Sequence, residues 1–291
     1  MKLDRSRGIL ILVSILPFLI GSIMGFAILG NPLFSEVISS TVRSYTVAEL
    51  AVQAVISICL GSAIVLSLFW ILERRSSRGR RMMVAFIVSP ILSLVFFVLG
   101  QSLLLILFKG TSSTILSAII SLGSLGVFMF SIVFIMMDAI PPLMRNLFAV
   151  FYGSIFGTFL GVTFITSSMI VLILSIIVED YLLIRFSPAA KASPMTERAG
   201  SDPFDYTRIQ SESIAVGAGD FVAFSMISTH ALLYFPLYVW VASFSLAVIG
   251  VIINVTFVLR EHEPLPGIPI PALLAIYPWL IHLIAYLPFV G

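Results

Sequence analysis

Long apolar stretches, each close to the length that crosses a lipid bilayer, follow one another along nearly the whole chain. A membrane-spanning helix needs about 20 mostly apolar residues, and the 291-residue sequence contains nine such stretches. They are residues 8–30, 47–72, 83–108, 113–137, 144–162, 165–186, 213–234, 237–259 and 269–289. Only 10% of the residues are charged, whereas soluble domains have roughly 25%. The sequence therefore predicts an all-α polytopic membrane protein of about nine transmembrane helices.

The boundary between the fifth and sixth stretches is the least marked, because no charged residue occurs from Asn146 to Val178. A single helix over this block would be about 50 Å long at 1.5 Å per residue. That length exceeds the hydrocarbon thickness of roughly 30 Å. Two spans joined by a tight turn near Gly161–Ser168 fit better, since Gly, Thr and Ser in this segment suit a turn.

Basic residues are unevenly distributed between the two sides of the predicted spans. With a cytoplasmic N-terminus, fourteen of the 16 Lys and Arg residues lie on the cytoplasmic side, and only Arg43 and Lys109 lie outside. Cytoplasmic loops of membrane proteins are enriched in Lys and Arg, so we expect the N-terminus inside and the C-terminus outside. The first stretch lacks a small-residue cleavage site and is interpreted as a spanning helix.

The predicted chain has three parts. Residues 1–186 contain the first six spans, residues 187–212 form a flexible cytoplasmic loop rich in Pro, Ser and charge, and residues 213–291 contain the last three spans. The single cysteine, Cys59, excludes an intramolecular disulfide. The three histidines do not form an HExxH motif, so we expect no metal site.

Acidic residues inside two of the spans are the main chemical signal. Ionisable groups in a bilayer are costly and usually mark function. Asp180 lies about six residues before the end of one stretch, and Asp220 lies about six after the start of the next. These spans run in opposite directions from a shared loop, so we expect the two carboxylates at similar depth. Two carboxylates that meet share a proton, and aspartic proteases use such a pair.

Glycines and prolines accompany these acids. Gly217 and Gly219 precede Asp220, and glycine permits bends, close approach of another chain and close helix packing. Pro271 follows Pro269 at the start of the ninth stretch. Because proline lacks an N–H, we expect at least one carbonyl there to lack an intrahelical partner and to bind water or an extended substrate.

These motifs resemble those of a known family. Gly217-Ala218-Gly219-Asp220 resembles the GxGD motif of presenilins and signal peptide peptidases, and Pro271-Ala272-Leu273 resembles their PAL motif. Asp180 matches the first catalytic aspartate of the family, although Glu179 stands where the family usually has tyrosine. The resemblance covers the nine-span layout, with sharp matches in spans six to nine. The small size and the N-in topology are similar to archaeal presenilin-like homologues.

The resemblance implies a presenilin-like fold and an intramembrane aspartyl endopeptidase in the cell membrane of an archaeon. Asp180 and Asp220 would form the catalytic pair. Active-site support and substrate positioning would fall to Gly217, Gly219, Pro271, Ala272 and Leu273. The substrates would be transmembrane segments or signal peptides that unwind before attack. No cofactor is expected, because water is the nucleophile. Membrane lipid is the other expected partner, nucleic acid is not one, and a homo-oligomer is left open.

The sequence also allows other functions and another choice of first acid. A proton-coupled secondary transporter would use the same buried carboxylates, but it predicts inverted repeats that are not evident. An inactive homologue acting as a scaffold is disfavoured by the intact pair of acids. Glu179 is the alternative first acid, and it lies about 100° from Asp180 around a helix. Asp138 is expected at a helix end. Asn254-Val255-Thr256 matches a glycosylation pattern, but it lies within a span, where that pattern has no meaning.

Overall fold

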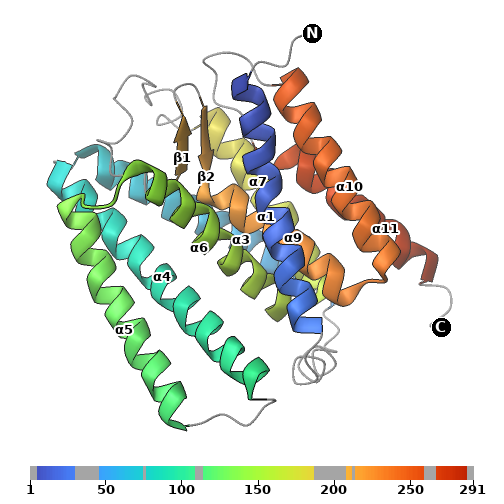
Figure 1. The fold of residues 1–291 in the computed structure, drawn as a ribbon. Helices are drawn as coiled ribbons and strands as arrows, with labels where there is room; N and C mark the ends of the chain where they lie inside the picture. Colours follow the sequence, from blue (N-terminus) through green and yellow to red (C-terminus); the bar gives the residue numbers. More distant parts are fainter. Residues whose placement is uncertain are drawn as a thin grey trace.

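The computed structural model describes residues 5–29, 46–74, 77–108, 114–186, 208–211, 214–258 and 267–286. Over these residues the chain forms nine α-helices, one π-helical turn and one β-hairpin (Figure 1). The helices are α1 (Arg5–Leu29), α3 (Val47–Arg74), α4 (Ser77–Leu107), α5 (Thr114–Met137), α6 (Pro142–Thr163), α7 (Thr166–Phe186), α9 (Ala218–Tyr234), α10 (Leu237–Ile253) and α11 (Pro269–Tyr286). The hairpin consists of β1 (Arg208–Ser211) and β2 (Ile214–Gly217), and the π-helical turn η2 (Asn254–Val258) continues α10.

Several of these helices identify the chain as a multi-pass integral membrane protein. Within the described residues, five helices are long and apolar enough to cross a membrane. They cover Arg7–Leu29, Arg78–Leu105, Thr114–Met137, Met144–Thr163 and Leu237–Val258. Large apolar side chains such as Leu12, Leu122 and Phe130 are exposed on α1 and α5, as expected of surfaces that contact lipid. The helical membrane-protein class is thus confirmed apart from the short hairpin, and each of the nine predicted stretches overlaps one described α-helix.

Of two predicted span boundaries, one agrees with the structure and one does not. The turn between the fifth and sixth predicted spans is confirmed, because α6 ends at Thr163 and α7 begins at Thr166. The predicted span 213–234 begins too early, since residues 214–217 form a strand and α9 starts at Ala218. In the predicted flexible loop, residues 208–211 form the partner strand of an antiparallel pair, whereas residues 187–207 lie outside the described part.

Helix α9 is the centre of the bundle, with α1 and α6 packed along it (Figure 1). From Phe221 to Leu233 every side chain except that of Val222 is buried. Glycines at every fourth position of α6 face it, at Gly153, Gly157 and Gly161. A Cβ at Gly161 would lie only 2.7 Å from the Met226 carbonyl oxygen. Such small residues allow helix backbones to approach closely within a membrane.

Hydrogen bonds between helices add to this close packing of α9. The hydroxyl of Thr229 donates to the Gly21 carbonyl of α1 at 2.9 Å. The Tyr234 hydroxyl donates to the Val162 carbonyl of α6 at 2.7 Å. His230 is fully buried, and its Nδ1 lies 2.9 Å from the Gly161 carbonyl oxygen. These bonds satisfy polar groups inside the bundle and fix the rotation of α9 relative to its two main neighbours.

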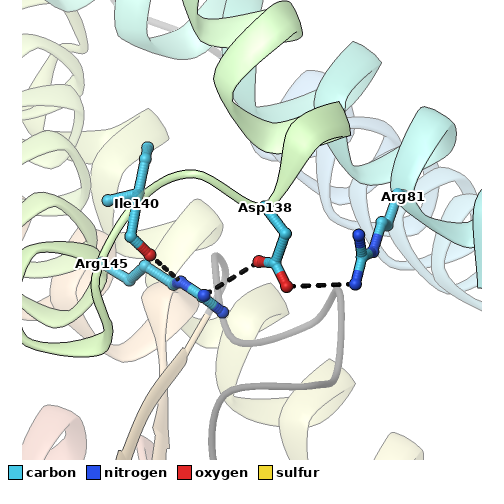
Figure 2. Close-up of polar contacts among 4 residues, drawn as sticks. All are labelled: Arg81, Asp138, Ile140 and Arg145. Carbon is cyan, nitrogen blue, oxygen red and sulfur yellow. Dashed lines mark hydrogen bonds and ion pairs between the residues drawn. The ribbon is translucent and has the colours of Figure 1, made fainter.

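An ion-pair cluster joins the α4–α5 hairpin to α6 (Figure 2). Asp138 follows α5 and binds Arg81 of α4 at 3.1 Å and Arg145 of α6 at 2.9 Å. The Arg145 side chain also donates from Nε to the Ile140 carbonyl at 2.7 Å. Asp138 is a helix-end residue as expected, and its φ of 54° is the left-handed conformation typical of a helix terminus. Glycine would suit this backbone conformation, but it could not form the ion pairs that the Asp138 carboxylate makes with Arg81 and Arg145.

Candidate active site

The two predicted acids come together from different helices. Asp220 is the third residue of α9, and Asp180 lies six residues before the end of α7. The amide of Ile268 donates to Asp180 Oδ2 at 3.3 Å. The preceding residue, Gly267, lies against the other acid, because a Cβ at Gly267 would be 2.6 Å from Asp220 Oδ2. Both carboxylates therefore contact the same two-residue segment before α11.

Glu179 faces a different helix. A Cβ built on Gly61 of α3 would lie 2.6 Å from Glu179 Oε1, so the carboxylate packs against the α3 backbone. Asp180, one residue later, turns towards Ile268. The roughly 100° between successive residues of a helix explains this division. Of the two neighbouring acids, Asp180 is the one that shares a contact segment with Asp220.

The glycines before Asp220 border open space. Among the described residues, a Cβ at Gly219 would meet no atom within 4 Å, and one at Gly217 would meet only the Gly219 nitrogen at 3.9 Å. Both residues are exposed. Among the described residues, no other helix packs closely against either glycine. They leave accessible backbone beside Asp220.

The proline segment at the start of α11 packs tightly against α10. Pro271 and Ala272 are buried, whereas Leu273 is 48% exposed. A Cβ at Gly250 of α10 would lie 2.6 Å from Pro271 Cα, so the two backbones are in direct contact. The first turn of α11 closes through a 3.0 Å hydrogen bond from the Ala272 amide to the Ile268 carbonyl.

One carbonyl in this segment lacks an intrahelical donor, as expected, and it is that of Gly267. Its donor in a regular helix would be the amide of residue 271, which is a proline. The side chain of Asn254 takes that place, with Nδ2 donating to the Gly267 carbonyl at 3.3 Å. The expected partner was water or an extended substrate; in the structure, the buried Asn254 side chain of η2 is a partner of this carbonyl.

Asn254 and Gly267 are thus the site residues that the sequence interpretation missed. A polar amide within an apolar span is costly unless it has a partner, and that signal was available at Asn254. Gly267 offered no comparable signal, since its importance depends on a contact with a residue 47 positions earlier in the chain.

No group of three or more His, Cys, Asp or Glu side chains that could hold a metal ion occurs within the described ranges. Comparison of the sequence with protein-family models finds no match, and comparison with curated proteins finds none either. A functional interpretation of the site therefore depends on its own residues and geometry.

Proposed function

We propose that the chain is an intramembrane-cleaving aspartyl endopeptidase of the presenilin and signal-peptide-peptidase type. The observation that carries the proposal is the convergence of Asp180 and Asp220 on the backbone of Gly267 and Ile268. Two acids on separate helices meet beside the proline segment that the motif resemblance associates with the active site. The nine-span layout with a cytoplasmic N-terminus, like the presenilin-like fold, belongs to the same proposal.

The chemistry follows from two carboxylates that share one proton. The ionised carboxylate takes a proton from water as the water attacks the scissile carbonyl, and the protonated carboxyl donates to the carbonyl oxygen. Each group therefore has a role that the other cannot fill at the same moment. Activity should rise and then fall with pH, because both the fully protonated and the fully ionised pair are inactive. Full activity at every pH would exclude a shared proton.

The surroundings of the acids suit an extended substrate. A helical substrate hides its carbonyls in its own hydrogen bonds, so local unwinding must precede attack. Gly217 and Gly219 offer open backbone on one side of Asp220, and strand β2 ends at Gly217. The exposed side chain of Leu273 lies at the start of α11. These groups support binding of an unwound segment between the hairpin end and the proline segment.

Asp220 is the third residue of α9, so its carboxylate lies near one end of the central helix and not at its middle. Water, the nucleophile of the proposed reaction, then has a shorter path to the acids.

The test is cleavage of a transmembrane peptide by the purified protein in detergent, with product masses read by mass spectrometry. We expect cuts inside the apolar segment, loss of cleavage in Asp180→Asn and Asp220→Asn, and substantial activity in Glu179→Gln. All variants must remain monodisperse, so that loss of activity is separate from loss of fold. Cleavage by Asp180→Asn together with an inactive Glu179→Gln would reassign the first acid.

The secondary transporter is tested in parallel. Protein reconstituted in liposomes is assayed for proton movement that depends on Asp180 and Asp220. Coupled proton transport without peptide cleavage would replace the protease proposal.

A further inference from the structure

One face of α10 and η2 holds the start of α11 in place through small and polar residues. Ser243, Gly250 and Asn254 are spaced so that they fall on one side of the helix. The Ser243 hydroxyl donates to the Ala275 carbonyl at 2.6 Å. Gly250 contacts the Pro271 backbone, and Asn254 donates to the Gly267 carbonyl. Of these three residues, Asn254 is the nearest to the two acids, because its partner Gly267 also lies against Asp220.

The bond made by Asn254 has a geometric consequence for Asp180. The carbonyl of Gly267 and the amide of Ile268 are the two ends of one peptide unit, which is planar and rigid. Asn254 holds the carbonyl end at 3.3 Å, and Asp180 accepts from the amide end at 3.3 Å. Fixing one end of a rigid plane fixes the direction of the other. The orientation of the amide towards Asp180 therefore depends on Asn254.

The same peptide unit also sets the distance to the second acid. The Cα of Gly267 is itself one of the atoms of this plane, and it lies so close to Asp220 that no Cβ would fit without moving the carboxylate. A rotation of the plane would therefore change the contacts of both carboxylates together. Pro271 leaves this unit without the helical hydrogen bond that would otherwise hold it, so an external anchor is required.

We infer that Asn254 is a positioning residue of the aspartyl pair. Through the Gly267–Ile268 peptide unit it holds Asp180 and Asp220 in the arrangement that the reaction needs. Gly267 also contributes to this positioning, because only glycine leaves space for the Asp220 carboxylate. The expected effect of Asn254 on cleavage rests on the proposed function. Its anchoring of the Gly267–Ile268 peptide unit does not depend on any activity.

The first test replaces Asn254 with leucine, which has a similar shape and no donor. We expect kcat for a transmembrane peptide to fall roughly 100-fold, as for a misplacement of about 1 Å at a reacting group. KM should stay near the wild-type value, because no substrate contact is removed. Thr256→Val is the matched control. It also removes a donor from η2, but one that bonds only to its own helix at Ile252.

The second measurement is hydrogen exchange at the Ile268 amide, which requires no activity. Asn254→Leu and Asp180→Ala should each speed this exchange, because each releases one end of the same peptide unit, while Thr256→Val leaves it unchanged. If the wild-type protein cleaves no peptide but shows this exchange pattern, the proposed protease function fails and the anchoring stands. Unchanged exchange in Asn254→Leu, or wild-type kcat, overturns the inference.

A third variant changes the Gly267–Ile268 peptide unit directly, and it tests the inference even if Asn254→Leu does not fold. Gly267→Ala leaves Asn254 intact and adds one methyl group against Asp220. We expect the same loss of kcat with KM retained. Gly126→Ala is its control, since a Cβ there meets no atom within 4 Å. Full activity of Gly267→Ala would overturn the inference.

Discussion

Gly157→Ala tests whether the position of α9 depends on backbone contact with α6. A Cβ at Gly157 would overlap the Val222 carbonyl oxygen and the Ser225 hydroxyl, and would lie 2.8 Å from the Val222 carbonyl carbon. The hydroxyl can rotate away, but the carbonyl belongs to the backbone of a buried helix and cannot. One methyl group must therefore push α6 and α9 apart.

Two opposing effects determine the magnitude. Replacing glycine by alanine inside a helix normally stabilises it by about 0.5–1 kcal/mol. Overpacking a well-packed interior costs about 1–3 kcal/mol. The overlap at Gly157 involves backbone atoms, so we expect the upper part of that range and a net destabilisation of about 1–2 kcal/mol. Val222 follows Asp220 by two residues, so the displacement should also lower cleavage by at least about tenfold.

The assay is equilibrium unfolding in mixed micelles, with cleavage measured on the same preparations. Gly126→Ala in α5 is the control, because it carries the same helix-propensity gain without any neighbouring atom within 4 Å. It should be neutral or slightly stabilising. If Gly157→Ala were as stable as Gly126→Ala, close contact between the α6 and α9 backbones would not be what positions the central helix.

Three further predictions concern topology, the ion-pair cluster and the proline segment. A cysteine label near Lys191 should react from the cytoplasmic side and one after Val290 from the outside, and labelling of both from one side would remove a span. Asp138→Gly keeps the left-handed backbone but takes the carboxylate from Arg145, which is 5% exposed. The free energy of unfolding should fall by about 1–3 kcal/mol, and an unchanged value would contradict a stabilising role. Leu273→Arg, at a side chain that is 48% exposed, should lose most cleavage in protein that remains monodisperse; wild-type cleavage by such protein would exclude a substrate contact there.

The helices could be predicted from the sequence because lipid imposes a simple requirement on length and polarity. Each run had to be long and apolar, and charges or prolines marked most of the ends. The hairpin could not be found this way. Residues 214–217 read Ile-Ala-Val-Gly, which is apolar and continuous with the following helix, and a short apolar run has no periodicity that separates strand from helix.

The candidate site was predictable in part for the same reason. Asp180 and Asp220 were expected to meet because their spans share a loop and place them at similar depth. The resemblance favoured Asp180 over Glu179, whereas the different contacts of the two side chains depend on the rotation of α7 against α3, which no local pattern gives. The link between Asn254 and Gly267 needed the register of α10 against α11. No local pattern encodes that register.

Small residues connect the packing of the bundle to the geometry of the acids. In lipid, burial of apolar surface does not hold helices together, so close backbone contact and hydrogen bonds must. Gly157 brings α6 against α9 near Asp220, and Gly250 brings α10 against Pro271. Each contact fixes a backbone that carries or touches an acid. Larger residues at these positions would separate the helices, and the two carboxylates would no longer contact one peptide unit. The open backbone at Gly219 lies beside Asp220, and the proposed substrate would reach the acids there without displacing a helix.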